Sequence, residues 1–159
     1  MPEKKKPGRQ PMPQRPEHER TRDFKEVPVG YSDENARAEA VRCLQCRKPA
    51  CIEGCPVSIR IPEFIHLIAE GRFLEAAAKL KEETALPAVC GRVCPQESQC
   101  EKTCVLARKG EPVAIGHLER FAADYERAQG EAKALARAES TGFSVAIVGA
   151  GPAGLTAAG

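Results

Sequence analysis

Two short blocks of cysteines constrain this chain more than any other feature of its sequence. The chain has 159 residues and eight cysteines, and all of the cysteines fall within these blocks. The first block holds Cys43, Cys46, Cys51 and Cys55, and the second holds Cys90, Cys94, Cys100 and Cys104. Thiolates at such short spacings are typical of proteins that bind soft cations. The blocks therefore predict a metal-binding or iron–sulfur protein.

The gaps between the cysteines favour iron–sulfur clusters over zinc. Zinc sites commonly use Cys-x2-Cys pairs, and only Cys43 and Cys46 have that spacing. Cys55 and Cys94 are each followed by proline, which is typical of iron–sulfur binding. Eight thiols would fill two sites of four, although the last cysteine of a ferredoxin run commonly ligates the other cluster. Zinc stays an alternative, and disulfides are the third interpretation.

The composition limits both the core and the classes of partner. Aromatic residues make up 4% of the chain, and tryptophan is absent. A conventional core is therefore small, and a bound inorganic cluster could replace part of it. The formal net charge is +2, so the chain as a whole has no strong field for nucleic acid or for a membrane surface, and neither is expected as a partner.

The N-terminal sequence indicates a cytoplasmic protein. Its basic residues are not followed by the apolar run of a secretory signal. No apolar stretch approaches the length that spans a bilayer. Cytoplasmic cysteines serve metal or redox roles more often than structural disulfides, which agrees with the interpretation of the two blocks.

We expect a disordered tail followed by an all-α domain. Residues 1–21 are rich in proline and basic residues, and such a segment cannot bury enough apolar surface to offset its ordering entropy. Residues 22–127 carry helical patterns. Ser32 can cap the first helix, which would deliver Cys43 and Cys46 at its end.

A helical hairpin is expected between the cysteine blocks. Pro62 suits the first turn of one helix, Gly71 ends that helix, and Pro87 ends the next one. Their apolar stripes are formed by Ile61, Phe64, Ile65 and Ile68 and by Phe73, Ala76, Ala77 and Leu80. Glu75 and Lys79 are spaced for an ion pair. A last helix opens near Gly116, and its stripe is formed by Leu118, Phe121, Ala122 and Tyr125.

The end of the chain carries the pattern of a dinucleotide-binding unit. Residues 128–142 are charged and Ala-rich, which predicts a helical linker. Residues 144–148 form an apolar strand pattern that runs into the turn Gly149-Ala-Gly151-Pro-Ala-Gly154. Gly-x-Gly-x-x-Gly between a strand and a helix lets a pyrophosphate approach the helix N-terminus. Residues 143–159 are therefore expected to be the truncated start of a Rossmann-type domain, with these three glycines at the cofactor.

The sequence contains no constellation for hydrolytic catalysis. It shows neither a Ser/His/Asp arrangement nor a carboxylate pair with a clear acid–base role, so no catalytic residue is predicted. His18, His66 and His117 are interpreted as ordinary tail, helix and helix residues rather than as metal ligands.

The order of these motifs resembles the N-terminal region of the glutamate synthase small (beta) subunit family. The resemblance covers residues 22–159 and rests on Glu39-Ala-Val-Arg-Cys-Leu-Gln-Cys46, Cys51-x3-Cys55-Pro, Cys90-Gly-Arg-Val-Cys-Pro95, Cys100-Glu-x-x-Cys104, Ile115-Gly-His-Leu-Glu-Arg-Phe121 and Val148-Gly-Ala-Gly-Pro-Ala-Gly-Leu155. That family also includes the large subunit of NADH-dependent ferredoxin:NADP oxidoreductase. It is similar to the N-terminal region of dihydropyrimidine dehydrogenase.

The resemblance implies an α-helical ferredoxin-like domain with two 4Fe–4S clusters. The family pattern maps one cluster onto Cys43, Cys46, Cys51 and Cys104. It maps the other cluster onto Cys55, Cys94, Cys100 and Glu119. Cys90 matches a family cysteine that is not a ligand, although spacing alone would have used it. Without the family, Glu119 would be interpreted as an exposed helical carboxylate.

The resemblance also implies a function for the full-length protein. In the family, NADPH reduces FAD, and electrons then pass through the clusters to a partner such as the large (alpha) subunit of glutamate synthase. Neither nucleotide site is complete within 159 residues, so the chain alone is expected not to oxidise NADPH. Two alternatives stay open. One is a subunit of an electron-bifurcating ferredoxin:NADP oxidoreductase, and the other is a zinc-stabilised helical interaction module.

Overall fold

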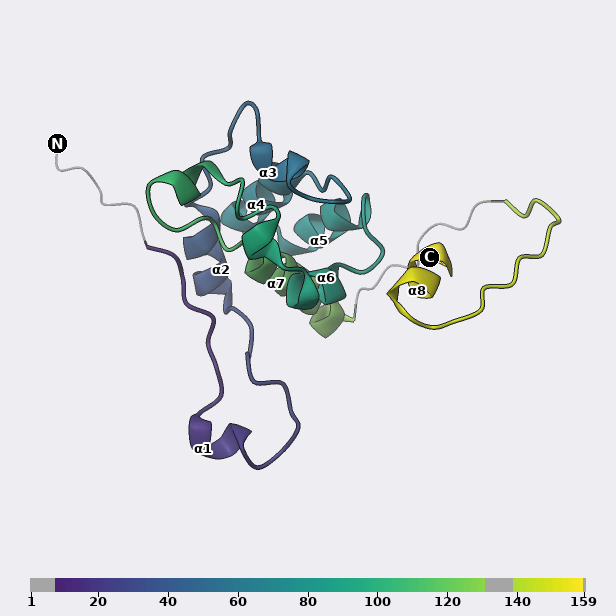
Figure 1. Cartoon of the computed structure of the whole chain (residues 1–159), viewed down its shortest axis with the longest axis horizontal. Coiled ribbons are helices and arrows are strands. Elements are labelled where there is room, and N and C mark those ends of the chain that lie inside the picture. Colours follow the sequence, from purple (N-terminus) through teal and green to yellow (C-terminus); the bar gives the residue numbers. More distant parts are fainter. Residues whose placement is uncertain (1–7, 131–138, 159) are drawn as a thin grey trace.

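The computed structural model describes residues 8–130 and 139–158, and the regular secondary structure in these ranges is helical (Figure 1). The helices are α1 (Glu17–Arg20), α2 (Asp33–Ala40), α3 (Ala50–Glu53), α4 (Ile61–Glu70), α5 (Phe73–Lys81), α6 (Pro87–Val93), α7 (Ile115–Gln129) and α8 (Pro152–Ala158), with 3-10 turns η1 (Gln96–Ser98) and η2 (Val105–Arg108). Within these two ranges, β pairing is limited to an isolated bridge between Gln14 and Pro28. The predicted all-α fold is confirmed.

Helices α2, α4 and α5 form where the sequence predicts them. Ser32 caps α2, because its hydroxyl accepts a hydrogen bond from the backbone N–H of Asn35. α4 carries Pro62 in its first turn and ends at Gly71, whose φ of 80° is left-handed. α4 and α5 pack against each other. Their buried residues are the expected stripes, Ile61, Phe64, Ile65 and Ile68 in α4 and Phe73, Ala76, Ala77 and Leu80 in α5.

Helix α7 packs against α2, α4, α5 and α6 and so occupies the middle of the domain. The ring of Phe121 in α7 meets the ring of Phe73 in α5 edge-to-face, with centroids 4.9 Å apart. Gly91 lets α6 approach α7, because a Cβ atom there would lie 2.6 Å from the backbone nitrogen of Arg120. The contact between α6 and α7 therefore requires glycine at position 91. Leu118 and Ala122 of the expected α7 stripe are fully buried.

The N-terminal segment forms a hairpin that projects from the domain. The backbone N–H of Arg15 donates to the carbonyl of Val27 at 2.9 Å. The Arg15 guanidinium also contacts both carboxylate oxygens of Asp23 at 2.8 Å. Figure 1 shows α1 at the tip of this hairpin, away from the other helices.

This hairpin is a correction to the prediction of a disordered tail over residues 1–21. Residues 1–7 lie outside the described residues, but from residue 8 onward the chain makes defined contacts. Few of these contacts bury apolar surface. The segment is ordered mainly by hydrogen bonds and ion pairs to distant residues, which hydrophobicity and composition do not reveal.

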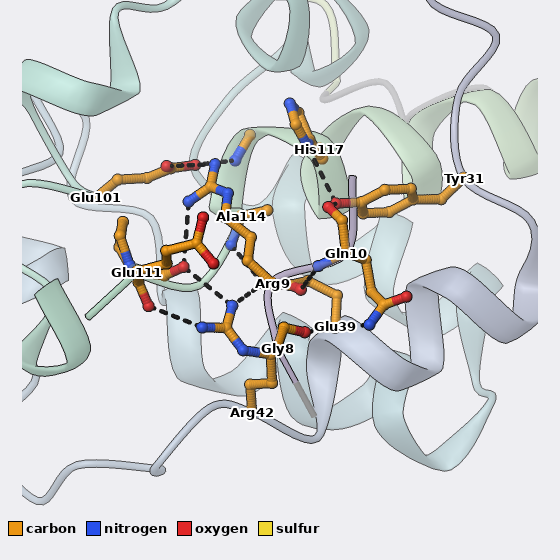
Figure 2. Close-up of polar contacts among 12 residues, drawn as sticks. Gly8, Arg9, Gln10, Tyr31, Glu39, Arg42, Glu101, Glu111, Ala114 and His117 are labelled. Carbon is orange, nitrogen blue, oxygen red and sulfur yellow. Dashed lines mark hydrogen bonds and ion pairs between the residues drawn. The ribbon is translucent and has the colours of Figure 1, made fainter. Parts of the chain in front are cut away.

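Buried Glu39 of α2 ties this segment to the domain (Figure 2). Its side chain is fully buried. One carboxylate oxygen pairs with Arg42 and accepts a 2.8 Å hydrogen bond from the backbone N–H of Ala114. The other oxygen accepts a 2.7 Å hydrogen bond from the backbone N–H of Gln10. The hydroxyl of Tyr31 donates to the carbonyl of Gln10 at 2.6 Å, so the segment is held from two sides.

Two arginines then fasten the loop that precedes α7. Arg42 donates to the backbone carbonyls of Glu111 and Pro112 at 2.7 and 3.0 Å. Arg9 donates to the same Pro112 carbonyl at 3.1 Å and pairs with the buried carboxylate of Glu101 at 2.8 Å. Since Arg42 directly precedes Cys43 and Glu101 directly follows Cys100, this network joins the two cysteine blocks.

Two details of the predicted hairpin are wrong. Pro87 does not end the preceding helix, which already stops at Lys81. It begins α6 instead, because its missing N–H suits a first helical turn. Glu75 pairs with Arg72, whereas Lys79 pairs with Glu63 at 3.3 Å and with Glu82 at 2.9 Å. Several acids surround each base on this exposed face, so spacing alone does not select the partner.

The C-terminal region shows the predicted turn and helix but not the predicted strand. Residues 144–148 form no strand, and no described segment pairs with them. A strand gains its backbone hydrogen bonds only from a neighbour, which explains the difference. α7 ends at Gly130, with a left-handed φ of 68°, and part of the predicted linker, residues 131–138, lies outside the described residues. In the described parts of the chain, no helix is long and apolar enough to cross a membrane.

We predict that Glu39→Ala destabilises the domain strongly. Removing one partner of a buried ion pair leaves an unpaired charge on Arg42 and typically costs about 3–5 kcal/mol of the free energy of unfolding. Urea denaturation followed by circular dichroism measures this loss. Glu75→Ala, which removes an exposed pair with Arg72, serves as the control and should change little. Equal midpoints for the two variants would contradict the role given to Glu39.

Candidate metal centres

The first group of predicted ligands surrounds a cavity. Its lining includes all four thiols, those of Cys43, Cys46, Cys51 and Cys104. The rest of the lining is largely apolar and includes Leu44, Pro62, Leu106 and Val113. The cavity is partly open to solvent. Residues from both cysteine blocks therefore meet at one place, as the family pattern requires.

Local turns bring each thiol of this first group to the cavity. α2 ends at Ala40, and its carbonyl accepts a 3.1 Å hydrogen bond from the backbone N–H of Cys43. Gln45 adopts a left-handed φ of 49°, which turns the chain between Cys43 and Cys46. Cys51 lies on the short helix α3. Cys104 sits at the start of η2. The helix expected to deliver Cys43 and Cys46 at its end therefore stops slightly earlier, at Ala40.

The two blocks approach closely at Gly54. A Cβ atom at this position would lie 2.6 Å from the Thr103 hydroxyl oxygen and 2.9 Å from the Gln99 carbonyl oxygen. Atoms at such distances overlap, so only glycine fits without movement of its neighbours. Gly54 lies between Cys51 and Cys55, and its close contact holds the second block against the first.

Burial and mutual repulsion both disfavour free thiolates in this first group. Burial, followed by charges on Cys43 and Cys104, raises the pKa of Cys51 to about 11. The pKa of Cys43 is also raised, first by burial and then by charges on Cys104 and Cys46. Thiols that repel one another when ionised are stabilised as thiolates by a shared cation. The group is therefore suited to a cationic or iron–sulfur ligand.

The remaining predicted ligands form a second group beside α6 and α7. Burial, followed by charges on Glu101, Cys55 and Glu119, raises the pKa of Cys100 to about 12. Burial also raises the pKa of Cys94 to about 11, with contributions from Cys90, Glu119 and Cys55. Cys55 and Glu119 therefore lie within electrostatic range of both Cys94 and Cys100.

Glu119 is a buried carboxyl with an unsatisfied oxygen. It lies on α7 with 6% of its surface exposed, and its Oε1 has no hydrogen-bond partner among the described residues. Burial raises the pKa of this carboxyl to about 8. A buried polar atom without a partner is costly, and a cation would satisfy it. The interpretation of Glu119 as an exposed helical carboxylate is therefore wrong.

Cys90 lies on α6, next to the second group. Its sulfur is 3.9 Å from the hydroxyl oxygen of Thr84, and it raises the pKa of Cys94 both by its charge and by a side-chain hydrogen bond. Cys90 does not line the cavity of the first group. Its position therefore suits a neighbour of the second group, and the prediction that it is not a ligand stays a prediction.

The described residues hold no group of three or more His, Cys, Asp or Glu side chains arranged around a single metal ion. The four cysteines of the first group nevertheless line one cavity. The Oε1 atom of Glu119, which has no hydrogen-bond partner among the described residues, and the thiol-lined cavity both fit iron–sulfur cofactors.

The glycines predicted to contact a nucleotide lie in the turn before α8. Gly149 adopts a left-handed φ of 112°, and a Cβ atom on Gly154 would lie 2.0 Å from the Gly149 carbonyl oxygen. Gly151 also belongs to this turn, and its carbonyl accepts a hydrogen bond from the N–H of Leu155 at 2.9 Å. The turn has the tight geometry that the motif requires, while its cofactor contacts stay a prediction.

Comparison with known proteins agrees with the class that the fold and the two groups define. A helical domain with thiols around an apolar cavity and a second group that includes a buried carboxyl is typical of an iron–sulfur protein. The chain belongs to the family described as dihydropyrimidine dehydrogenase domain II, 4Fe-4S cluster, whose model matches residues 20–131. The predicted resemblance to this group of proteins is confirmed.

Several relatives are small chains of glutamate synthase (NADPH). The chain is 42% identical to the small chain of Azospirillum brasilense over 151 residues. These residues are 94% of this chain and 31% of the relative. It is 42% identical over 146 residues to the small chain of Escherichia coli strain K12, and these residues are 92% of this chain and 31% of that relative. The NAD-dependent dihydropyrimidine dehydrogenase subunit PreT of the same strain is 39% identical over 132 residues, covering 83% and 32%. The chain thus spans about a third of these relatives.

We predict that Glu119→Ala and Cys90→Ala differ in how much iron the reconstituted chain retains. Loss of Glu119 should remove one cluster and leave about four iron atoms of about eight, whereas loss of Cys90 should leave the iron content unchanged. Iron and acid-labile sulfide per chain measure both, with circular dichroism to check folding. The reverse result, with iron lost only from Cys90→Ala, would show that Cys90 is the ligand.

A second prediction concerns the contact at Gly54. Gly54→Ala places a Cβ atom against Thr103 and Gln99, so it should separate the cysteine blocks and lower both iron content and melting temperature. Gly110→Ala is the matched control, because no atom lies within 4 Å of a Cβ atom there. If both variants bind iron like the unaltered chain, the close approach of the blocks is not required.

Proposed function

We propose that this chain is the iron–sulfur electron-transfer domain of an oxidoreductase similar to the glutamate synthase small chain. The observation that carries the proposal is the cavity lined by Cys43, Cys46, Cys51 and Cys104, which come from two separate blocks. The matching family supplies the 4Fe–4S identity. The relatives that bear the glutamate synthase name supply the oxidoreductase class.

In this proposal the side chains hold two 4Fe–4S clusters. The first would be ligated by Cys43, Cys46, Cys51 and Cys104. The second would be ligated by Cys55, Cys94, Cys100 and Glu119. Such clusters supply reversible one-electron storage when bound. The protein's own contribution is to bring the ligands together from the two cysteine blocks and to position Glu119 on α7.

The proposal extends to a longer protein with the domain organisation of the relatives. There, residues 143–159 would begin an FAD-binding domain, with Gly149, Gly151 and Gly154 near the pyrophosphate. NADPH would reduce the flavin, and electrons would leave or enter through a partner such as the large (alpha) subunit of glutamate synthase. The proposed compartment is the cytoplasm, where thiols stay reduced.

The final electron acceptor is a separate question. PreT is named as a subunit of a different enzyme, an NAD-dependent dihydropyrimidine dehydrogenase, and it shares this region with the chain. The same domain therefore occurs in relatives with different named reactions. An electron-bifurcating ferredoxin:NADP oxidoreductase subunit is the alternative within this class, and a zinc-stabilised interaction module is the alternative outside it.

The metal content of the reconstituted chain tests the proposal. Two clusters predict about eight iron and about eight sulfide per chain, a brown colour that dithionite bleaches, and electron paramagnetic resonance signals from the reduced sample. We expect the 159-residue chain by itself not to oxidise NADPH. Zinc without sulfide would overturn the electron-transfer function in favour of the interaction module.

A further inference from the structure

The two segments that form the mouth of the first cavity carry an excess of positive charge. Residues 41–49 and 102–110 both contribute to the cavity lining. Their exposed cations are Arg47, Lys48, Lys102, Arg108 and Lys109. Neither segment contains an aspartate or a glutamate. We call this surface the basic mouth. Its charge is local, because the whole chain has a formal net charge of only +2.

The cations of the basic mouth have no ion pairs with the part of the chain that the structure describes. Other exposed or half-buried bases do have them: Arg15 pairs with Asp23, and Arg92 pairs with both Glu26 and Asp124. The nearest exposed acids along the chain are Glu53 and Glu111, outside the two segments. The charges of the mouth are therefore available to a partner.

Apolar side chains are exposed on the same two segments. Val41 is 54% exposed, and Leu44 and Val105 are each 41% exposed. Leu44 and Val105 also line the cavity that the thiols surround. Apolar residues next to charged ones are typical of a protein–protein interface, with an apolar centre and a charged rim. A partner that covers these residues would come directly against the first group of thiols.

We propose that the basic mouth is the docking surface for a redox protein that presents carboxylates around an apolar patch. This inference rests on the proposed function, because the partner exchanges electrons with the cofactor of the first group. Complementary charge speeds the encounter of such proteins and orients them. Electron-transfer encounters use small interfaces, which suits a surface built from two short segments. No exposed aromatic residue occurs in either segment, which disfavours a single-stranded nucleic acid as the occupant.

The test uses the 159-residue chain with reconstituted clusters, reduced by dithionite. The probes are two haem proteins of opposite charge, acidic cytochrome b5 and basic cytochrome c, each in its oxidised form. One electron moves from the reduced chain to the haem iron, which changes from ferric to ferrous. Stopped-flow absorption gives the second-order rate constant at each ionic strength, and iron content is measured for every variant.

Charge reversal in the mouth is compared with the same change elsewhere. The double variant Arg47→Glu/Lys48→Glu alters the mouth, and Arg22→Glu/Lys25→Glu is the matched control on the N-terminal hairpin, where both side chains are exposed. We expect the mouth variant to lower the rate constant with cytochrome b5 by at least about tenfold at low salt. This loss should vanish at high salt, and the control should match the unaltered chain. With cytochrome c, the mouth variant should not be slower.

Each other outcome has a definite meaning. If both double variants slow cytochrome b5 equally, net charge and not the basic mouth governs the encounter, and the docking proposal is wrong. It is also wrong if neither variant changes the rate although the clusters are present. A preparation that binds no iron and sulfide contradicts the proposed function itself. A mouth variant that loses binding to single-stranded DNA but keeps its rate with cytochrome b5 would assign the mouth to nucleic acid.

Discussion

The gathering of cysteines from two separate blocks, together with the buried carboxyl of Glu119, is the constraint on which the domain depends. Burial raises the pKa of Cys51, Cys94 and Cys100, and charges on neighbouring cysteines raise these three pKa values as well. Glu119 adds a buried oxygen without a hydrogen-bond partner among the described residues. Such groups contribute little to stability by themselves. Their arrangement makes physical sense when a cofactor binds them, since its binding energy then becomes folding energy.

The rest of the domain holds these groups in place. Helices α4 and α5 supply the apolar core, and α7 carries Glu119 across it. The buried carboxylate of Glu39 joins α2, the N-terminal segment and the loop before α7 (Figure 2). Gly54 then allows the two cysteine blocks to touch. The proposed cofactor sites thus depend on contacts between residues that lie far apart in the sequence.

The sequence predicted the parts of this structure that follow from local patterns. The buried stripes of α4 and α5 follow from helical spacing, and the caps follow from Ser32 and Gly71. The ordered N-terminal segment was missed because its contacts join Gln10 to Glu39 and Arg9 to Glu101. Proline-rich composition says nothing about such long-range bonds. The inward position of Glu119 followed from the family resemblance, whereas helical spacing alone left it exposed.

The most direct test of the account is anomalous X-ray diffraction at the iron edge from crystals of the reconstituted chain. The account predicts iron at two places in each chain. One lies in the cavity lined by Cys43, Cys46, Cys51 and Cys104, and the other lies against Cys55, Cys94, Cys100 and Glu119. Iron at a single place, or a zinc signal in place of iron, would contradict the two-cluster domain.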